Sequence, residues 1–123
     1  MNPRISDAEL EVMEVLWAAG GPLTAAEVAE RVGAERGWSM ATIKTMLWRL
    51  LAKHAIDHRQ DGRRYLYAPA IARESYVGKE SRRLVDQLFG GRISPLLARL
   101  AEDEALDAED IAAIEQILKE LKS

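Results

Sequence analysis

The sequence predicts a mainly α-helical fold that includes one small β-hairpin. Apolar residues recur at three- and four-residue spacing along most of the chain, as they do on one face of an amphipathic helix. Glycine and proline residues interrupt this pattern and divide it into segments. One stretch, residues 56–67, instead alternates with a period of two around Asp61-Gly62. This pair favours a tight turn between two strands, because both residues can adopt positive φ angles.

Three helices are expected before residue 55. Two Ser/Thr-x-x-Glu patterns predict helix starts at Ser6 and Thr24, because the first and last residues of such a pattern cap each other's free backbone amides. Glycines are expected to end these two helices, at Gly20 and Gly33. A third helix, with a serine cap, is expected over residues 39–54. The residues expected to face inward from it are Ile43, Met46, Leu47, Leu50 and Leu51.

The period-two stretch follows the third helix directly. Ile56 and His58 fall on its first strand, and Tyr65 and Tyr67 fall on its second. Three helices followed by a hairpin is the order of elements in a winged helix-turn-helix domain. In such a domain the third helix enters the major groove of DNA and the hairpin, or wing, lies along the backbone. The sequence therefore predicts a winged helix DNA-binding domain over residues 1–70.

Residues 71–123 are expected to form a C-terminal helical dimerisation domain. Helices are predicted over residues 71–89, 94–102 and 107–121, and the pair Gly90-Gly91 should end the first of them. Each helix has an apolar face, but the chain offers no obvious intramolecular partner large enough to cover all of these faces. A second copy of the chain would supply that partner, so we expect a homodimer.

The composition excludes several classes of protein. No apolar run approaches the roughly 18 residues that a membrane helix needs, and the first residues lack the features of a secretory signal, so we expect a cytoplasmic protein without membrane insertion. The absence of cysteine removes disulfides, thiolate catalysis and cysteine-type metal sites. His54 and His58 stand on either side of a helix-to-strand boundary, so we expect surface or hinge roles and no metal site. No catalytic arrangement is present in the sequence, so we expect neither an enzyme nor a cofactor.

Positive charge is concentrated in the middle of the chain. The whole protein has a net charge of −3, but residues 36–68 hold seven basic and two acidic side chains and therefore carry +5. A basic segment of this kind suits the polyanionic backbone of DNA. Within it, Arg63 and Arg64 stand just past the expected turn, and Arg63 is the preferred candidate for a phosphate contact.

The third helix has small, hydroxylic and basic residues on the faces that do not point inward. Such side chains can contact thymine methyl groups, base edges and phosphates. A solvated helix face without DNA contacts is the alternative for this helix. A winged helix module used only for protein–protein interaction is the alternative for the whole domain. The residues on these faces are Ala41, Thr42, Lys44, Thr45, Trp48 and Arg49.

The three tryptophans are expected to be structural. Trp17 and Trp48 fall in or beside helical stripes, and core or core-edge packing is expected for them. Trp38 stands just before the third helix and is expected to pack under its start.

Six motifs together span nearly the whole chain: SDAELEVMEVLW, WSMATIKTMLWRLLAK, DGRRYLYAP, SYVGKESRRLVDQLFGG, ISPLLARL and LDAEDIAAIEQILKELK. Through these motifs the chain resembles the BlaI/MecI/CopY family of penicillinase repressors and their copper-responsive relatives. The resemblance implies a dimeric transcriptional repressor that is joined by its C-terminal helices and binds a dyad-symmetric promoter operator. The operator contacts of the family fall here on Ser39, Thr42, Lys44, Thr45, Arg49 and Arg63.

The resemblance also bears on base preference and on release from DNA. Met40 and Ala41 stand where relatives often have proline and lysine, which implies a different base preference in the half-site. In antibiotic-responsive members a membrane-bound sensor metalloprotease leads to cleavage of the repressor in its tail, and the matching positions here are Ala98 and Arg99. The copper-responsive members use tail cysteines, and this chain has none.

Overall fold

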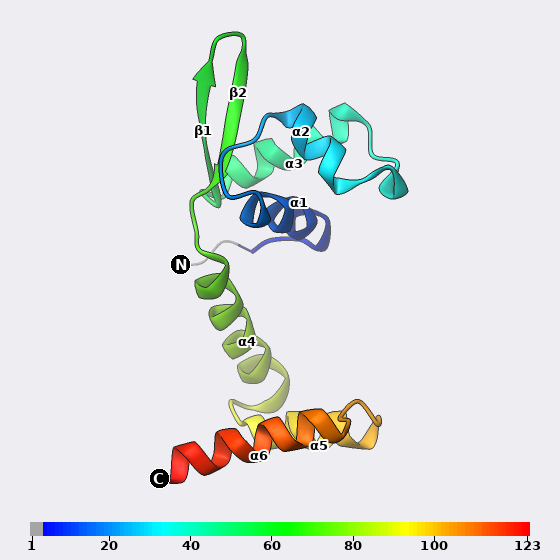
Figure 1. Ribbon diagram of the computed structural model, residues 1–123, viewed down its shortest axis with the longest axis vertical. Helices are drawn as coiled ribbons and strands as arrows, with labels where there is room; N and C mark the ends of the chain where they lie inside the picture. Colours follow the sequence, from blue (N-terminus) through cyan, green and yellow to red (C-terminus); the bar gives the residue numbers. More distant parts are fainter. Residues whose placement is uncertain (1–3) are drawn as a thin grey trace. The chain divides into compact units, whose positions relative to one another are not determined.

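The computed structural model describes residues 4–123 (Figure 1). The chain forms two compact units, one up to Lys79 and one from Glu80 onward. The expected mainly α-helical fold with one hairpin is confirmed. The elements are α1 (Asp7–Ala18), α2 (Ala25–Val32), the short 3-10 helix η1 (Ala34–Arg36), α3 (Met40–Ala52), β1 (Ile56–Asp61), β2 (Arg64–Pro69), α4 (Arg73–Phe89), α5 (Ile93–Glu102) and α6 (Ala108–Lys122).

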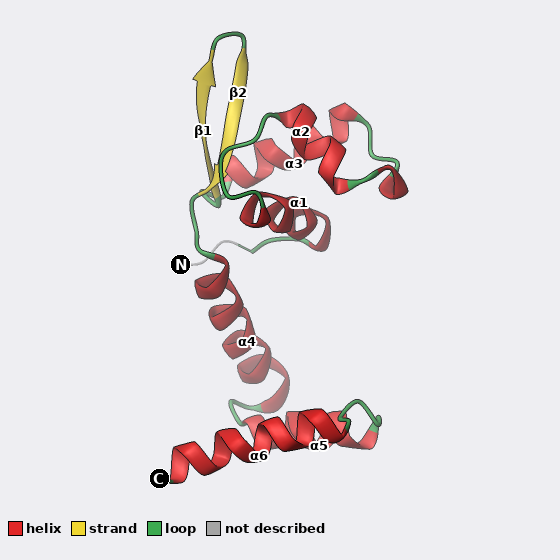
Figure 2. Cartoon of the chain, viewed as in Figure 1, coloured by secondary structure: helices red, strands yellow, loops and turns green. Residues whose placement is uncertain are grey.

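The N-terminal unit contains three packed helices and an antiparallel hairpin that projects beside them (Figure 2). Both expected capping boxes are present. Ser6 accepts a hydrogen bond from the backbone amide of Glu9, and Thr24 accepts one from that of Glu27. The helices meet in one apolar core, which also takes in the start of the first strand. Its buried members are Val12, Met13, Leu16, Leu23, Val28, Ile43, Leu47, Leu50, Ala55 and Ile56.

The end of α3 turns the chain sharply into β1. His54 has a φ of 61°, in the left-handed region where the chain commonly leaves a helix. Two backbone hydrogen bonds close the turn, from the amide of His54 to the carbonyl of Leu51 at 3.0 Å and from the amide of Ala55 to that of Leu50 at 2.9 Å. His54 is therefore a hinge residue, as expected, and α3 ends two residues before it, at Ala52.

The turn of the hairpin differs by one residue from the sequence-based expectation. Asp61 pairs with Arg64 across the ladder, so the two loop residues are Gly62 and Arg63 instead of Asp61 and Gly62. Gly62 has a φ of 67° and Arg63 is not among the positive-φ residues, which matches a turn that needs glycine only at its first central position. The shift places Arg63 at the tip of the wing and Arg64 at the start of β2.

A short backbone bridge holds the base of the wing to the helices. Leu23 lies between α1 and α2. Its amide donates to the carbonyl of Tyr67 at 2.9 Å, and its carbonyl accepts from the amide of Tyr67 at 2.7 Å. Leu23 is itself buried in the core. The wing is thus hydrogen-bonded to the loop that precedes α2.

The first turns of α4 are attached to α1. The indole nitrogen of Trp17 donates to the carbonyl of Ile71 at 2.9 Å, and its ring lies 5.9 Å from the ring of buried Tyr76. Arg73 donates to both carboxylate oxygens of Glu14, at 2.7 and 3.2 Å. This hydrogen bonding lowers the pKa of Glu14, which outweighs the small opposite effect of burial.

The C-terminal unit buries little of its own apolar surface. Neither α5 nor α6 has a buried residue, although each has apolar residues at helical spacing. Asp107 and Asp110 form a capping box at the start of α6. The large exposed apolar residues of this unit are Leu84, Leu88, Ile93, Ile111, Ile117, Leu118 and Leu121. Among the described residues, no helix is both long and apolar enough to cross a membrane.

Candidate nucleic-acid interface

The helix α3 has one buried face and one exposed face. Ile43, Leu47 and Leu50 are at most 1% exposed and anchor the helix in the core. The opposite face has a stripe of residues at the spacing i, i+4, i+7 and i+11, which places them nearly in line along a helix with 3.6 residues per turn. These exposed residues are Ala41, Thr45, Trp48 and Ala52.

Two basic residues border this exposed stripe. Lys44 lies on one side of it and Arg49 on the other, and both side chains are exposed. Three of the four side chains in the stripe are small and let the helix backbone come close to a surface beside them, and the cations on its borders suit a surface of negative charge. The edge of a DNA groove has both properties.

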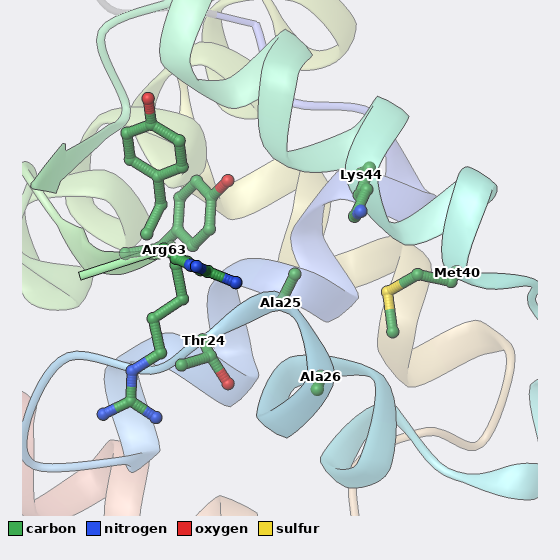
Figure 3. Close-up of a pocket in the computed structure, with 9 residues that line it drawn as sticks. Thr24, Ala25, Ala26, Met40, Lys44 and Arg63 are labelled. Atoms are coloured by element: carbon green, nitrogen blue, oxygen red, sulfur yellow. The ribbon is translucent and has the colours of Figure 1, made fainter. Parts of the chain in front are cut away.

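A hollow of about 420 Å³ lies between the start of α2, the start of α3 and the hairpin. Lys44 enters it from α3 and Arg63 from the tip of the wing (Figure 3). Ala25 and Ala26 in the first turn of α2 also border it, and their amides have no partner within the helix, whereas the amide of Glu27 is capped by Thr24. These amides and two cations together make a site suited to a phosphate group. The lining residues are Thr24, Ala25, Ala26, Met40, Lys44, Arg63, Arg64, Tyr65 and Tyr67.

Three of the seven basic residues in residues 36–68 form ion pairs with acidic side chains of the same chain. Arg36 pairs with Glu11, Lys53 pairs with the buried Glu9, and Arg64 pairs with Asp61 at 3.1 Å. The other four have no ion pair within residues 4–123 and keep their charge available to a partner. They are Lys44, Arg49, Arg59 and Arg63.

The hydroxyl groups of the expected site have local partners. Ser39 caps α3 by accepting from the backbone amide of Thr42 at 3.1 Å, and the two side-chain oxygens also lie 3.1 Å apart. The hydroxyl of Thr45 donates to the carbonyl of Ala41 at 2.9 Å, which leaves its methyl group as the part that faces outward. Ser39 and Thr42 therefore support the start of α3, and Thr45 offers a methyl group to whatever lies against the helix.

Two tyrosines of the wing were not among the expected site residues, although both line the hollow. Burial raises the pKa of Tyr67, with a smaller contribution from Tyr65, so its hydroxyl stays neutral. The ring of His58 lies 5.1 Å from that of Tyr65 and 6.1 Å from that of Tyr67. The alternating pattern placed these residues on a common strand face, but their position beside Lys44 depends on how the hairpin packs.

The tryptophans divide in a way that the sequence did not predict. Trp17 and Trp38 pack against the edge of the core, as expected. Trp48 is 69% exposed, which agrees with its expected place on an outer face of the third helix, whereas the core or core-edge packing expected for it is wrong. The core of α3 is already completed by residues on the other side of the helix, and Trp48 falls in the middle of the exposed stripe.

The histidines show no clustering with other ligands. His54 lies in the turn after α3 and His58 lies on the wing. Across residues 4–123, no group of three or more histidine, cysteine, aspartate or glutamate side chains is placed to hold a metal ion.

The three-helix core, the wing and the basic outer face of α3 define the N-terminal unit as a winged helix-turn-helix domain of the DNA-binding type. Residues 5–120 match the family model described as penicillinase repressor, and the chain belongs to this family.

Individual relatives agree with this assignment. The penicillinase repressor of Bacillus licheniformis is 36% identical over 121 residues, which cover 98% of this chain and 94% of the relative. Two solution structures of BlaI each share 42% identity and cover 62% of this chain and 92% of theirs. One is the DNA-binding domain of the repressor BlaI, with a TM-score of 0.55. The other is the B. licheniformis BlaI monomeric form in complex with the blaP half-operator, with a TM-score of 0.53.

Proposed function

We propose that this chain is a homodimeric transcriptional repressor that binds a dyad-symmetric promoter operator and is released by cleavage in its C-terminal region. The observation that carries the DNA-binding part is the convergence of Lys44, Arg63 and the first turn of α2 on one hollow. The exposed stripe of α3 would then face the bases of the major groove. Membership of the penicillinase repressor family supports the same function.

Two copies of the chain are expected to bind together. A single winged helix offers few phosphate contacts, whereas two linked modules bind far more tightly because the second contact becomes intramolecular. The exposed apolar residues of the C-terminal unit support dimerisation there, since a surface of this kind is buried when copies associate. The division into a DNA-binding domain over residues 1–70 and a dimerisation domain over residues 71–123 is part of this proposal.

Cleavage at Ala98 and Arg99 is the proposed route of release. Both residues are exposed and lie within α5, where Arg99 pairs with Asp103 at 3.2 Å. A protease binds its substrate in an extended form, so α5 has to open locally before it is cut. Because α5 has no buried residue, such opening costs little free energy. We propose that a membrane-bound sensor metalloprotease leads to this cleavage. The repressor itself is proposed to need no cofactor and to perform no catalysis.

The test of DNA binding is a salt titration with the full-length protein and its own promoter fragment. Lys44→Ala and Arg63→Ala should each weaken binding and lower the magnitude of the slope of log affinity against log salt by about two units, because each removes one phosphate contact from each of the two half-sites. The matched control is Arg31→Ala, which removes an exposed arginine outside the hollow and should leave the slope unchanged. Unchanged slopes for both variants would favour the protein-interaction alternative.

A further inference from the structure

Trp48 is the one bulky side chain in an exposed stripe that otherwise consists of alanine and threonine. Its side chain is 69% exposed, and its indole nitrogen has no hydrogen-bond partner within residues 4–123. The indole of Trp17, in contrast, donates to a backbone carbonyl at 2.9 Å. Burial of a large apolar ring that is held in water is favourable when a partner covers it.

The surroundings of Trp48 indicate the chemistry of that partner. Lys44 lies one helical turn before it, Arg49 is the next residue, and neither has an ion pair among the described residues. Cations on both borders of an apolar ring suit a partner that combines negative charge with apolar surface. The major groove of DNA does so, because phosphates line its edges and the methyl groups of thymine project into it.

The helix geometry also gives the position of the contact. Trp48 lies four residues beyond Lys44, which corresponds to about 6 Å along the helix axis. Where the helix axis follows the groove, this distance corresponds to about two base-pair steps of roughly 3.4 Å, so the ring meets a different base pair from the one that lies beside Lys44.

We propose that Trp48 is a specificity-determining residue that packs its indole ring on the methyl group of a thymine in each operator half-site, about two base pairs from the position of Lys44. The inference rests on the proposed function, and it adds a base preference that the basic residues cannot supply. Lysine and arginine contact phosphates or acceptor atoms, whereas an apolar ring or methyl group can distinguish thymine by its methyl group.

The experiment uses the full-length protein and a labelled promoter fragment in which each thymine is replaced in turn by uracil, which lacks only the methyl group. For the wild-type protein, one replacement in each half-site should lower the affinity about fourfold, the loss expected for one buried methyl group. Trp48→Ala removes the contact from both half-sites, so it should bind at least about 15-fold more weakly and lose its sensitivity to that replacement. Trp48→Phe should retain the sensitivity, because it keeps an aromatic ring. The matched control is Glu30→Ala, which alters an exposed residue of α2 outside the hollow and should behave as wild type.

The salt dependence separates this role from an electrostatic one. Because Trp48 is uncharged, Trp48→Ala should leave the slope of log affinity against log salt unchanged. A wild-type protein that responds to no thymine replacement, or a Trp48→Ala variant with wild-type affinity and wild-type uracil response, would overturn the inference while leaving operator binding intact. A wild-type protein that does not bind its promoter would overturn the proposed function as well. A uracil response of the wild type shows a thymine contact, and loss of that response in Trp48→Ala together with its retention in Trp48→Phe assigns the contact to Trp48.

Discussion

Removal of Lys53 from its ion pair with Glu9 should strongly destabilise the N-terminal unit, and replacing Lys53 by methionine tests this. Glu9 is 1% exposed, and one of its oxygens accepts from the amide of Ser6 at 2.8 Å and from the ammonium group of Lys53 at 2.5 Å. The other oxygen is buried and has no partner among the described residues. Lys53→Met keeps most of the apolar stem but leaves the carboxylate buried without its cation.

The magnitude follows from the burial of the two partners. Breaking a fully buried pair by removing one partner costs about 3–5 kcal/mol. The side chain of Lys53 is 33% exposed, so water can partly replace the lost ammonium group. We therefore expect the free energy of unfolding to fall by about 2 kcal/mol, which is a large part of the roughly 5–15 kcal/mol of a whole protein.

The dependence on pH has a definite sign. Burial raises the pKa of Glu9, but the hydrogen bonds from Lys53 and Ser6 and the charge of Lys53 together lower it below its usual value of 4.5. A group whose pKa is lower in the folded state stabilises the protein above the unfolded pKa, and this stability is lost as the pH falls through the folded pKa. The difference between wild type and Lys53→Met should be fully present at pH 7 and should shrink as the pH falls below 4.5.

Urea denaturation followed by circular dichroism at a series of pH values measures this difference. Lys44→Met is the matched control, since Lys44 is an exposed lysine without an ion pair among the described residues and its replacement should change stability by less than about 0.5 kcal/mol. Equal stability of Lys53→Met and wild type at pH 7, or a difference that does not change with pH, would refute the reasoning.

Two further predictions concern the core and the dimer. Leu47→Ala should lower the free energy of unfolding by about 2–5 kcal/mol, because Leu47 is 1% exposed and its removal leaves a cavity under α3. A shift of the urea midpoint reports this loss, and an unchanged midpoint would contradict the assigned core. Leu118→Glu should shift the protein from dimer towards monomer in sedimentation equilibrium, because it places a charge on the apolar face of α6. Glu120→Gln serves as its control on the same helix, and a variant that stays fully dimeric would remove this face from the interface.

The sequence by itself determined the local structure. The capping boxes at Ser6 and Thr24 and the cap at Ser39 predicted helix starts that the structure confirms, because each involves hydrogen bonds between residues three positions apart. The hairpin was expected from its alternating pattern for a similar reason, since the turn residues and the facing strands are close in the chain. Even there, the structure differs from the expectation by one residue, because Asp61 pairs with Arg64 and the turn residues are Gly62 and Arg63.

The make-up of the candidate interface was decided by the tertiary structure. The sequence counted seven basic residues in one segment, but packing determined that Arg36 and Lys53 face acidic groups of α1, 25 and 44 residues away along the chain. It also brought Lys44 and Arg63 to the same hollow and left Trp48 on the outer face of α3. Periodicity shows that a helix has an apolar face, but which residues near its edge are covered depends on the neighbouring elements. Those neighbours are placed by contacts between residues far apart in the chain, and no local pattern encodes them.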